Sequence, residues 1–257
     1  SLGILAYELI LGKLSHGVIR LDLLPTRLQQ IIGKALQENP KDRYADIVDL
    51  IADLSGSLQT IREETFPKPP QWAQVEIGLA VQADACPYVD FLHLSHNRYA
   101  IVLAEPSPPM KAATLRGMMR LALRVDHAPA KVLGHVNQAL CNDPIRMQFK
   151  ICLLVLDPDK DRLCFVSCKS TEILHILEGS LASRTLTTPN EALGSDATMN
   201  FLDTSDNWRA GDRLILNFHA KDETWLREQL ILPVQPLADK LMAHTPASAI
   251  ISLHRVY

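Results

Sequence analysis

A proline-rich stretch between residues 63 and 72 separates two parts of the chain that differ in hydrophobic periodicity. It reads Glu-Glu-Thr-Phe-Pro-Lys-Pro-Pro-Gln-Trp, with three prolines in four positions. Because proline fixes φ and has no backbone N–H, this stretch cannot form a helix and favours a stiff, extended connection. We therefore predict a boundary here, with one domain at residues 1–62, a linker at 63–74 and a second domain at 75–257.

Before the linker, apolar residues recur at the three- and four-residue spacing of a helix. The stripes are Leu2, Leu5, Ala6, Leu9 and Ile10, then Leu28, Ile31, Ile32, Ala35 and Leu36, then Ile47, Leu50, Ile51 and Leu54. They predict a small all-α domain of three helices. The chain opens at Ser1 directly on the first stripe, so we expect no signal peptide and a piece of a longer protein.

After the linker, the pattern changes to apolar runs of strand length separated by turn-like sequences. We expect strands at 75–83, 88–94, 99–104, 148–156, 163–168, 172–177 with a neighbour, 213–218 and 248–256. We expect helices at 110–125, 129–141, 223–229 and 236–243. Long strands with helices in pairs predict an α+β domain, in which helices cover an antiparallel sheet system.

Composition narrows the classes of function. The chain is 47% apolar and 21% charged, as in ordinary globular proteins. Its formal net charge of −3 gives no reason to expect nucleic acid or a membrane as partner, and no apolar run approaches the roughly 20 residues of a membrane span. The five cysteines form no Cys-x-x-Cys pair, so we expect no zinc site, no disulfide framework and a reducing, cytoplasmic compartment.

Two segments of the first part occur together in one known family. Residues 1–14 read Ser-Leu-Gly-Ile-Leu-Ala-Tyr-Glu-Leu-Ile-Leu-Gly-Lys-Leu, and residues 28–44 end in Asn-Pro-Lys-Asp-Arg-Tyr. In this order they resemble the central helix and the penultimate helix of the C-lobe of a Ser/Thr protein kinase. Chance similarity of a three-helix bundle is the alternative. The resemblance implies a kinase C-lobe remnant, and a Ser/Thr kinase in the parent protein.

The kinase resemblance does not imply kinase activity for this chain. The glycine-rich loop, the strand lysine, the catalytic-loop Asp and the metal-binding Asp-Phe-Gly all precede such a piece in a kinase. The family's glutamate partner for Arg43 is also absent, so Arg43 either finds a substitute or stays solvated. Because a large exposed apolar stripe is sticky, we expect the truncated lobe to pack on the second domain or on another copy, which leaves homo-oligomers open.

Short motifs of the second part follow the order of one phosphatase family. They are Asp90-Phe91, the helical stretch Pro129-Ala-Lys-Val-Leu-Gly-His-Val-Asn137, Leu193-Gly194, and Trp208-Arg-Ala-Gly-Asp-Arg-Leu-Ile-Leu. In this order they resemble the metal-dependent protein phosphatases of the PPM type, in their bacterial stage II sporulation E-like branch. The resemblance implies a phosphatase-like α/β/β/α sandwich. Such enzymes hold two divalent cations about 4 Å apart and activate a water between them, which requires several carboxylates.

Compared position by position with that family, the chain has lost most of the acids. Asp90 is the acid kept from the motif Gly-Gly-Asp-Phe-Tyr-Asp, whose second acid falls on His93. The Asp of the loop Asp-x-Ser-Gly-x-Gly falls on Ala104, with Glu105 one residue away, and prolines replace the pattern of that loop. Phe218-His219-Ala220 replaces Thr-Asp-Gly, and Ala247-Ser248 approximately replaces a final Asp-Asp.

We therefore expect a pseudophosphatase: a regulatory or protein-binding module, with no catalytic residues and no metal, attached to a Ser/Thr kinase in bacterial phospho-signalling. Its expected partner is a protein or phosphoprotein. The alternative is an active metal-dependent Ser/Thr phosphatase that uses Mn or Mg at a rebuilt site. That site would combine Asp90, His93, Glu105 and His219, or in its weakest form Asp90 and Glu105 alone. We expect Asp212 to be a turn residue rather than a ligand.

Overall fold

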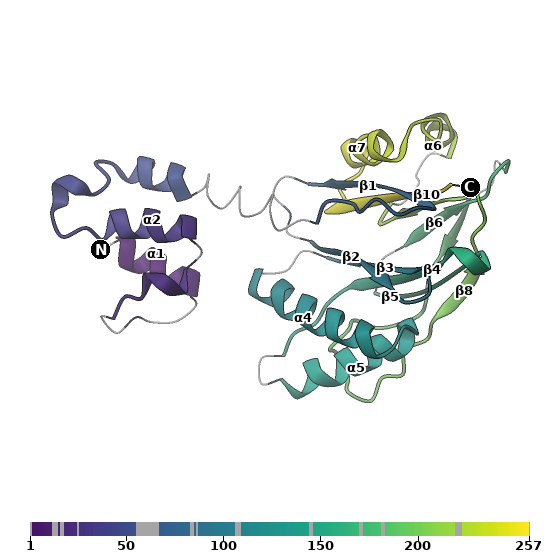
Figure 1. Ribbon diagram of the computed structural model, residues 1–257, viewed down its shortest axis with the longest axis horizontal. Coiled ribbons are helices and arrows are strands. Elements are labelled where there is room, and N and C mark those ends of the chain that lie inside the picture. The colour runs from purple at the N-terminus through teal and green to yellow at the C-terminus, as the bar shows by residue number, and fades with distance from the viewer. Residues whose placement is uncertain are drawn as a thin grey trace. The chain divides into compact units, whose positions relative to one another are not determined.

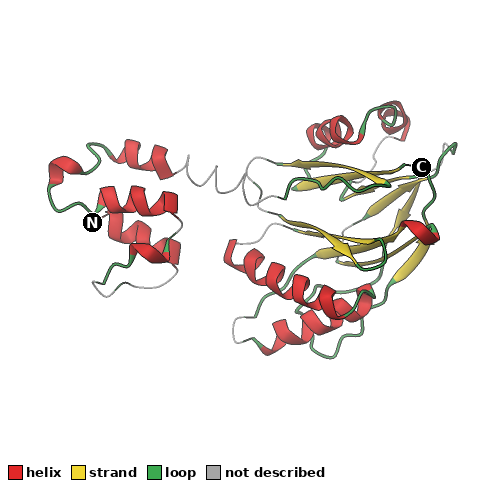
Figure 2. Ribbon diagram, viewed as in Figure 1, coloured by secondary structure: helices red, strands yellow, loops and turns green. Residues whose placement is uncertain are grey.

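The computed structural model describes residues 2–11, 15, 18–24, 26–54, 67–82, 85, 87–105, 109–143, 146–169, 172–180, 183–218 and 223–256. The chain divides into two compact units, Ser1–Phe66 and Pro67–Tyr257. They are drawn in Figures 1 and 2, and each is described by itself. Within the described ranges, no helix is both long enough and apolar enough to span a bilayer.

The first unit is helical, as its periodicity predicts. Helix α1 (Leu2–Leu11) packs against α2 (Thr26–Ala35), and residues 47–54 form a third helix. Two short 3-10 helices lie between them, η1 (Leu21–Leu23) and η2 (Pro40–Asp42). The core of the unit has two clusters of buried side chains, one of Tyr7, Leu24, Leu28 and Ile32 and one of Ile31, Ala35 and Leu50.

Arg43 has found substitute partners in this unit. Its Nε donates to the carbonyl of Gln37 at 2.6 Å, and its Nη2 donates to that of Glu38 at 3.2 Å. Carbonyls just beyond the end of a helix lack intrahelical donors, so a guanidinium there satisfies groups that the helix leaves open. Large apolar side chains nevertheless remain on the surface of the unit, including Val48 and Ile51, which are 64% and 54% exposed.

The second unit contains two five-stranded sheets in which all pairs are antiparallel. The first sheet has the order β1 (Val75–Val81), β10 (Ala249–Arg255), β9 (Arg213–Leu216), β6 (Ile173–Ile176) and β7 (Ser183–Leu186). The second has the order β2 (Tyr88–Leu94), β3 (Arg98–Ala104), β4 (Ile151–Asp157), β5 (Arg162–Cys168) and β8 (Thr204–Asn207). The two sheets stack face to face (Figure 2).

Helices cover the outer face of each sheet, which gives the predicted α/β/β/α sandwich (Figure 1). Helices α4 (Pro109–Val125) and α5 (Pro129–Asn142) cover the second sheet, and α6 (Glu223–Gln229) and α7 (Val234–His244) cover the first. Helix α7 lies so close to β1 that a Cβ on Gly78 would overlap the backbone of Val234. The inner strands β3 and β4 are almost continuously buried because each is covered on both faces, and their sequences are correspondingly apolar throughout.

Several element bounds differ by a few residues from the sequence prediction, and two differences have a clear physical reason. Strand β8 was not predicted because its sequence, Thr-Ser-Asp-Asn, has no apolar residue; it pairs along β5 at the edge of the sheet. Helix α7 begins at Val234, two residues earlier than predicted, since a proline in the first turn of a helix does not interrupt its hydrogen bonds.

Candidate functional site

The acid that the sequence singles out, Asp90, lies in β2, an edge strand of the second sheet. Successive side chains of a strand point to opposite faces of its sheet. Tyr88 packs in the cluster that the sheet shares with α4 and α5, whereas Val89 packs between the two sheets. Asp90 therefore faces the helix layer and is fully buried there.

Arg120 of α4 holds both carboxylate oxygens of Asp90. Its Nε donates to Oδ2 at 2.7 Å and its Nη2 donates to Oδ1 at 2.9 Å. The Tyr88 hydroxyl donates to Oδ2 at 3.2 Å, and the backbone N–H of Phe91 donates to Oδ1 at 3.1 Å. The hydrogen bond that Arg120 donates to Asp90 raises the pKa of Arg120, and burial raises the pKa of Tyr88. At neutral pH the carboxylate therefore has four donors and a complete countercharge.

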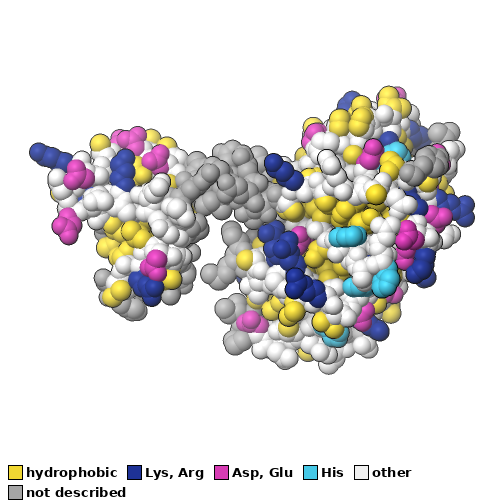
Figure 3. Space-filling model, in the orientation of Figure 1, with side chains coloured by type: hydrophobic (Ala, Val, Ile, Leu, Met, Phe, Trp, Pro, Cys, Tyr) yellow, Lys and Arg dark blue, Asp and Glu magenta, His cyan; other side chains and the backbone are white. Residues whose placement is uncertain are grey.

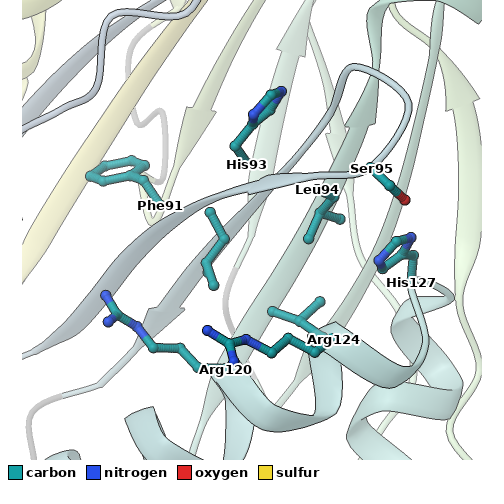
Figure 4. A pocket seen from close by; sticks show the side chains of 9 residues that line it. Phe91, His93, Leu94, Ser95, Arg120, Arg124 and His127 are labelled. Atoms are coloured by element: carbon teal, nitrogen blue, oxygen red, sulfur yellow. The ribbon is translucent and has the colours of Figure 1, made fainter.

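His93 lies on the other face of β2. Its ring stacks on Tyr99 with 5.2 Å between ring centroids, and Tyr99 stacks in turn on Trp72 at 4.2 Å. Figure 4 shows the imidazole on the opposite side of the β2 ribbon from Arg120. Because side chains three residues apart in a strand point to opposite faces, Asp90 and His93 cannot ligate one metal ion. The spacing of three residues in a predicted strand already indicated that Asp90 and His93 point to opposite faces. His93 therefore cannot belong to the rebuilt site with Asp90.

Ala104 and Glu105 lie at the end of β3, and neither turns toward Asp90. Ala104 is buried in the same apolar cluster as Tyr88 and supplies no ligand atom. Glu105 pairs with Lys150, whose Nζ lies 2.9 Å from its Oε2. The residue opposite Asp90 in β3 is Val102, so Glu105 lies three residues further along, about 10 Å at the rise of a strand. The structure does not bring these two acids together.

Other positions matched to the family's motifs adjoin one another in the first sheet. Phe218 follows β9 and Ala247 precedes β10, and these two strands are neighbours. Both residues are buried and apolar. His219 lies outside the described residues.

The described residues do not fit a pair of divalent cations. Among them, no group of three or more His, Cys, Asp or Glu side chains is arranged to hold a metal ion. Asp90 faces α4 and is bonded to a guanidinium, Ala104 has no oxygen on its side chain, and Glu105 is paired with a lysine. Two dications repel each other unless several anions surround them, and this arrangement offers one carboxylate that is already neutralised.

The asparagine in the helical motif has a structural role. Asn137 in α5 is buried, accepts from the backbone N–H of Gly194 at 2.7 Å and donates to the carbonyl of Asp196 at 2.7 Å. Gly194 has φ +84°, and a Cβ there would overlap the carbonyl of Met147. Both motif elements therefore position the loop at residues 193–196 rather than contact a ligand.

Arg120, the residue that binds both carboxylate oxygens of Asp90, was not identified from the sequence. The available signal was the spacing of three arginines at positions 116, 120 and 124, which places them on one side of a helix. The sequence could not show that this side of α4 meets β2, because the two residues belong to different elements and are joined only by packing.

A hollow of about 400 Å³ opens between β2 and α4 (Figure 4). Residues 91–95 line one side of it, and Arg120, Leu123, Arg124 and His127 line the other. Figure 3 shows Lys and Arg side chains gathered over α4, beside histidines and apolar surface. The Nη2 of Arg98 donates to Nδ1 of His127 at 2.6 Å, and burial together with Arg98 lowers the pKa of His127.

A second buried polar cluster surrounds His175 in β6. Its Nε2 lies 3.2 Å from Oδ2 of Asp212, and its Nδ1 lies 3.3 Å from Oδ2 of Asp206 in β8. Asp212 also accepts from the backbone N–H groups of Glu178 and Arg209, both at 2.9 Å. The bond from Arg209 closes a turn, as expected for Asp212. The cluster links the two sheets, since β6 and β8 belong to different ones.

The comparisons with known proteins agree with the phosphatase resemblance. Residues 109–217 match the family model described as Stage II sporulation protein E (SpoIIE). None of the curated proteins compared with the sequence matches it. The kinase resemblance of residues 1–62 is not tested by these matches.

Several solved structures share the fold of the second unit. The SiaA-PP2C domain of Pseudomonas aeruginosa is 13% identical, with a TM-score of 0.64, over 83% of this chain and 100% of that one. The PP2C phosphatase domain of SpoIIE from Bacillus subtilis, with a fragment of its regulatory domain, is 14% identical with a TM-score of 0.58 over 71% of this chain and 62% of that one. The RsbU and RsbW domains of a Mycobacterium tuberculosis protein are 16% identical with a TM-score of 0.56, again over 71% and 62%.

This chain therefore spans less than two thirds of the length of the last two structures. Identities of this size establish the fold, and the family model adds the sequence pattern of α4 through β9. The second unit is thus similar to the SpoIIE family in its sequence pattern over residues 109–217, and it has the fold of the PP2C phosphatase domains.

Proposed function

We propose that the second unit is a non-catalytic pseudophosphatase, a regulatory or protein-binding module of bacterial phospho-signalling. One observation carries the proposal: the single acid kept from the family's set is buried and has both oxygens bonded to Arg120. The guanidinium supplies a permanent positive charge at the carboxylate. Asp90 is thereby balanced within the chain itself.

The ion pair also opposes the entry of a metal ion. A dication bound to Asp90 would either lie against the positive charge of Arg120 or break two charge-assisted hydrogen bonds. Burial of the carboxylate increases this cost, because water cannot replace the lost bonds. A second cation would meet Ala104 where the family places an acid.

The resemblance of residues 1–62 to a kinase C-lobe supports a second part of the proposal, that the module is attached to a Ser/Thr kinase. A phosphatase-like unit in one chain with a segment that resembles a kinase C-lobe supports a role in phosphorylation signalling. In that setting a unit that binds a phosphoprotein or another protein partner can regulate signalling without catalysing a reaction.

Some structural neighbours favour the alternative, an active metal-dependent Ser/Thr phosphatase. RsbX has been solved in complex with magnesium, and the catalytic domain of PstP in complex with two manganese ions. They are 9% and 16% identical to this chain. If this chain were active, its ligands would have to include groups other than His93, with Asp90 released from Arg120.

The two functions separate in a manganese titration followed by calorimetry, combined with hydrolysis of an aryl phosphate. The catalytic domain of PstP serves as the positive control for both assays. We expect no saturable manganese uptake and no turnover above the blank, for the wild-type chain and for Asp90→Ala alike. Saturable uptake of two ions and turnover, both abolished in Asp90→Ala, would overturn the proposal.

A further inference from the structure

The outer side of β2 is an unpaired sheet edge. Strand β2 has one neighbour, β3, and stands first in its sheet. The backbone N–H of Phe91 donates to Oδ1 of Asp90, so it points away from β3. In an antiparallel pair the outward-pointing residues alternate, and the backbone groups of Val89 and His93 must also point outward. No backbone group in the described ranges bonds to that side of these residues.

The hollow follows this edge. The residues that line one side of it, 91–95, are consecutive along β2 and the turn that follows. The hollow therefore runs along the strand, next to its free edge. At about 3.3 Å per residue, five residues give a groove long enough for an extended segment of similar length.

The opposite wall of the groove is positively charged. Arg124 is exposed and makes no hydrogen bond or ion pair with a described residue. Arg120 is 53% exposed and uses its Nε and Nη2 for Asp90, which leaves other N–H groups of the guanidinium toward the groove. Figure 4 shows both arginines extending from α4 beneath β2. Asp90 neutralises one of these two charges, and the other is uncompensated.

We propose that this groove binds an extended acidic peptide segment of a partner protein, which adds as a strand to β2 and places carboxylates against Arg124 and Arg120. Strand addition uses backbone hydrogen bonds for affinity and alternate side chains for specificity. Every second side chain of the added strand turns toward α4, so a segment that alternates apolar and acidic residues matches the groove. Of the three outward-pointing residues Val89, Phe91 and His93, Phe91 already donates its backbone N–H to Asp90, so this N–H is not available to the added strand.

Charge selects this occupant over a second copy of the chain. Pairing of β2 with its own copy would bring two sets of Arg120 and Arg124 to one interface without new acids, and like charges repel there. An acidic strand removes that repulsion. The inference adds a partner surface to the proposed function. Peptide binding itself does not depend on that function; only its regulatory role rests on the pseudophosphatase proposal.

The probe is a fluorescein-labelled, end-capped peptide that alternates valine and glutamate, with binding followed by fluorescence anisotropy at low salt. The chemical controls replace glutamate by glutamine or by phosphoserine. In Arg124→Gln we expect about a tenfold weaker Kd, while Lys131→Gln, which removes the same charge from α5, leaves it unchanged. In His93→Pro we expect at least a tenfold loss, because proline removes an outward N–H yet leaves the bonds to β3.

Hydrogen exchange supplies a second measurement that does not depend on the variants. We expect the peptide to slow exchange of the His93 amide, which has no backbone partner among the described residues. Equal binding of the glutamine peptide, binding of the phosphoserine peptide alone, or a Kd unchanged in both Arg124→Gln and His93→Pro would overturn the inference. Because this test involves no metal or turnover, its failure is distinct from a failure of the pseudophosphatase proposal.

Discussion

Two buried aspartates in the second unit are neutralised in different ways. Asp212 receives two backbone N–H groups and the ring of His175, all from the interior. Asp90 receives the Nε and Nη2 groups of an arginine that is half exposed and lines the groove, besides the Tyr88 hydroxyl and one backbone N–H. Both carboxylates therefore have backbone donors, but the positive charge beside Asp90 comes from a single side chain of another element.

The difference shows how the charge balance of a buried acid can depend on one side chain while the fold is kept. A carboxylate held by backbone donors cannot be released without rearranging the chain. A carboxylate held by a side chain can be neutralised, or freed, by one substitution on α4. Arg120 balances the charge of Asp90, so the sandwich keeps this buried acid with a partner from within the chain.

The largest effect is expected for Asp212→Ala. The substitution leaves two backbone N–H groups and Nε2 of His175 without their acceptor, and we expect a loss of about 3 kcal/mol in the free energy of unfolding. Urea unfolding followed by circular dichroism measures it. Asp212→Asn keeps one acceptor oxygen and should lose less. A loss below about 1 kcal/mol for Asp212→Ala would contradict the structural role.

A smaller and asymmetric effect is expected at the other aspartate. Arg120→Gln leaves a buried carboxylate without countercharge, and we expect a loss of about 2 kcal/mol. Asp90→Asn leaves an arginine that reaches water, and we expect about 1 kcal/mol. Arg124→Gln, on the same side of α4, is the control and should change stability by less than about 0.5 kcal/mol.

A double-mutant cycle sharpens the same comparison. The double variant Asp90→Asn with Arg120→Gln should lose less than the sum of the single variants, since neither buried charge is then left alone. A larger loss for Asp90→Asn than for Arg120→Gln would show that the arginine, not the acid, depends on the pair, and would reverse the argument.

Much of the fold could be predicted because burial and periodicity agree along the second unit. Strand β2 was predicted at its observed limits, and the nearly continuous apolar runs of β3 and β4 predicted both strands. Strand β8 could not be found this way, since an edge strand of polar residues shows no apolar pattern. Its partner β5 provides the pairing that its own sequence does not indicate.

The site was predictable only in part. That Ala104 offers no ligand atom can be recognised from one position, because a methyl group cannot ligate a metal. The separation of Asp90 from His93 follows from the period of a strand, and so it too could be derived from the sequence. The bond from Arg120 could not, because it depends on how α4 is rotated against β2, which is set by the whole apolar cluster between them.

The smallest expected effect concerns pH at the rim of the groove. Burial, with Arg98 as the next cause, lowers the pKa of His127 in the folded chain below the ordinary value of about 6.5. The unfolded chain therefore binds this proton more readily, and His127 lowers stability as the pH falls from about 6.5 through the folded pKa. Above that window both states are neutral and His127 makes no difference.

His127→Gln removes this titration but keeps an acceptor for Arg98. Urea midpoints measured at pH 7.5 and pH 5 should differ less in the variant than in the wild type. Arg98→Gln removes one of the two main causes of the lowered pKa of His127, so it should also reduce the difference between the two urea midpoints, but by less. A steeper loss of stability in His127→Gln would mean that the folded chain binds the proton more tightly than the unfolded one. His127 would then be a cation at the rim, and the charge that selects an acidic strand would be larger at low pH.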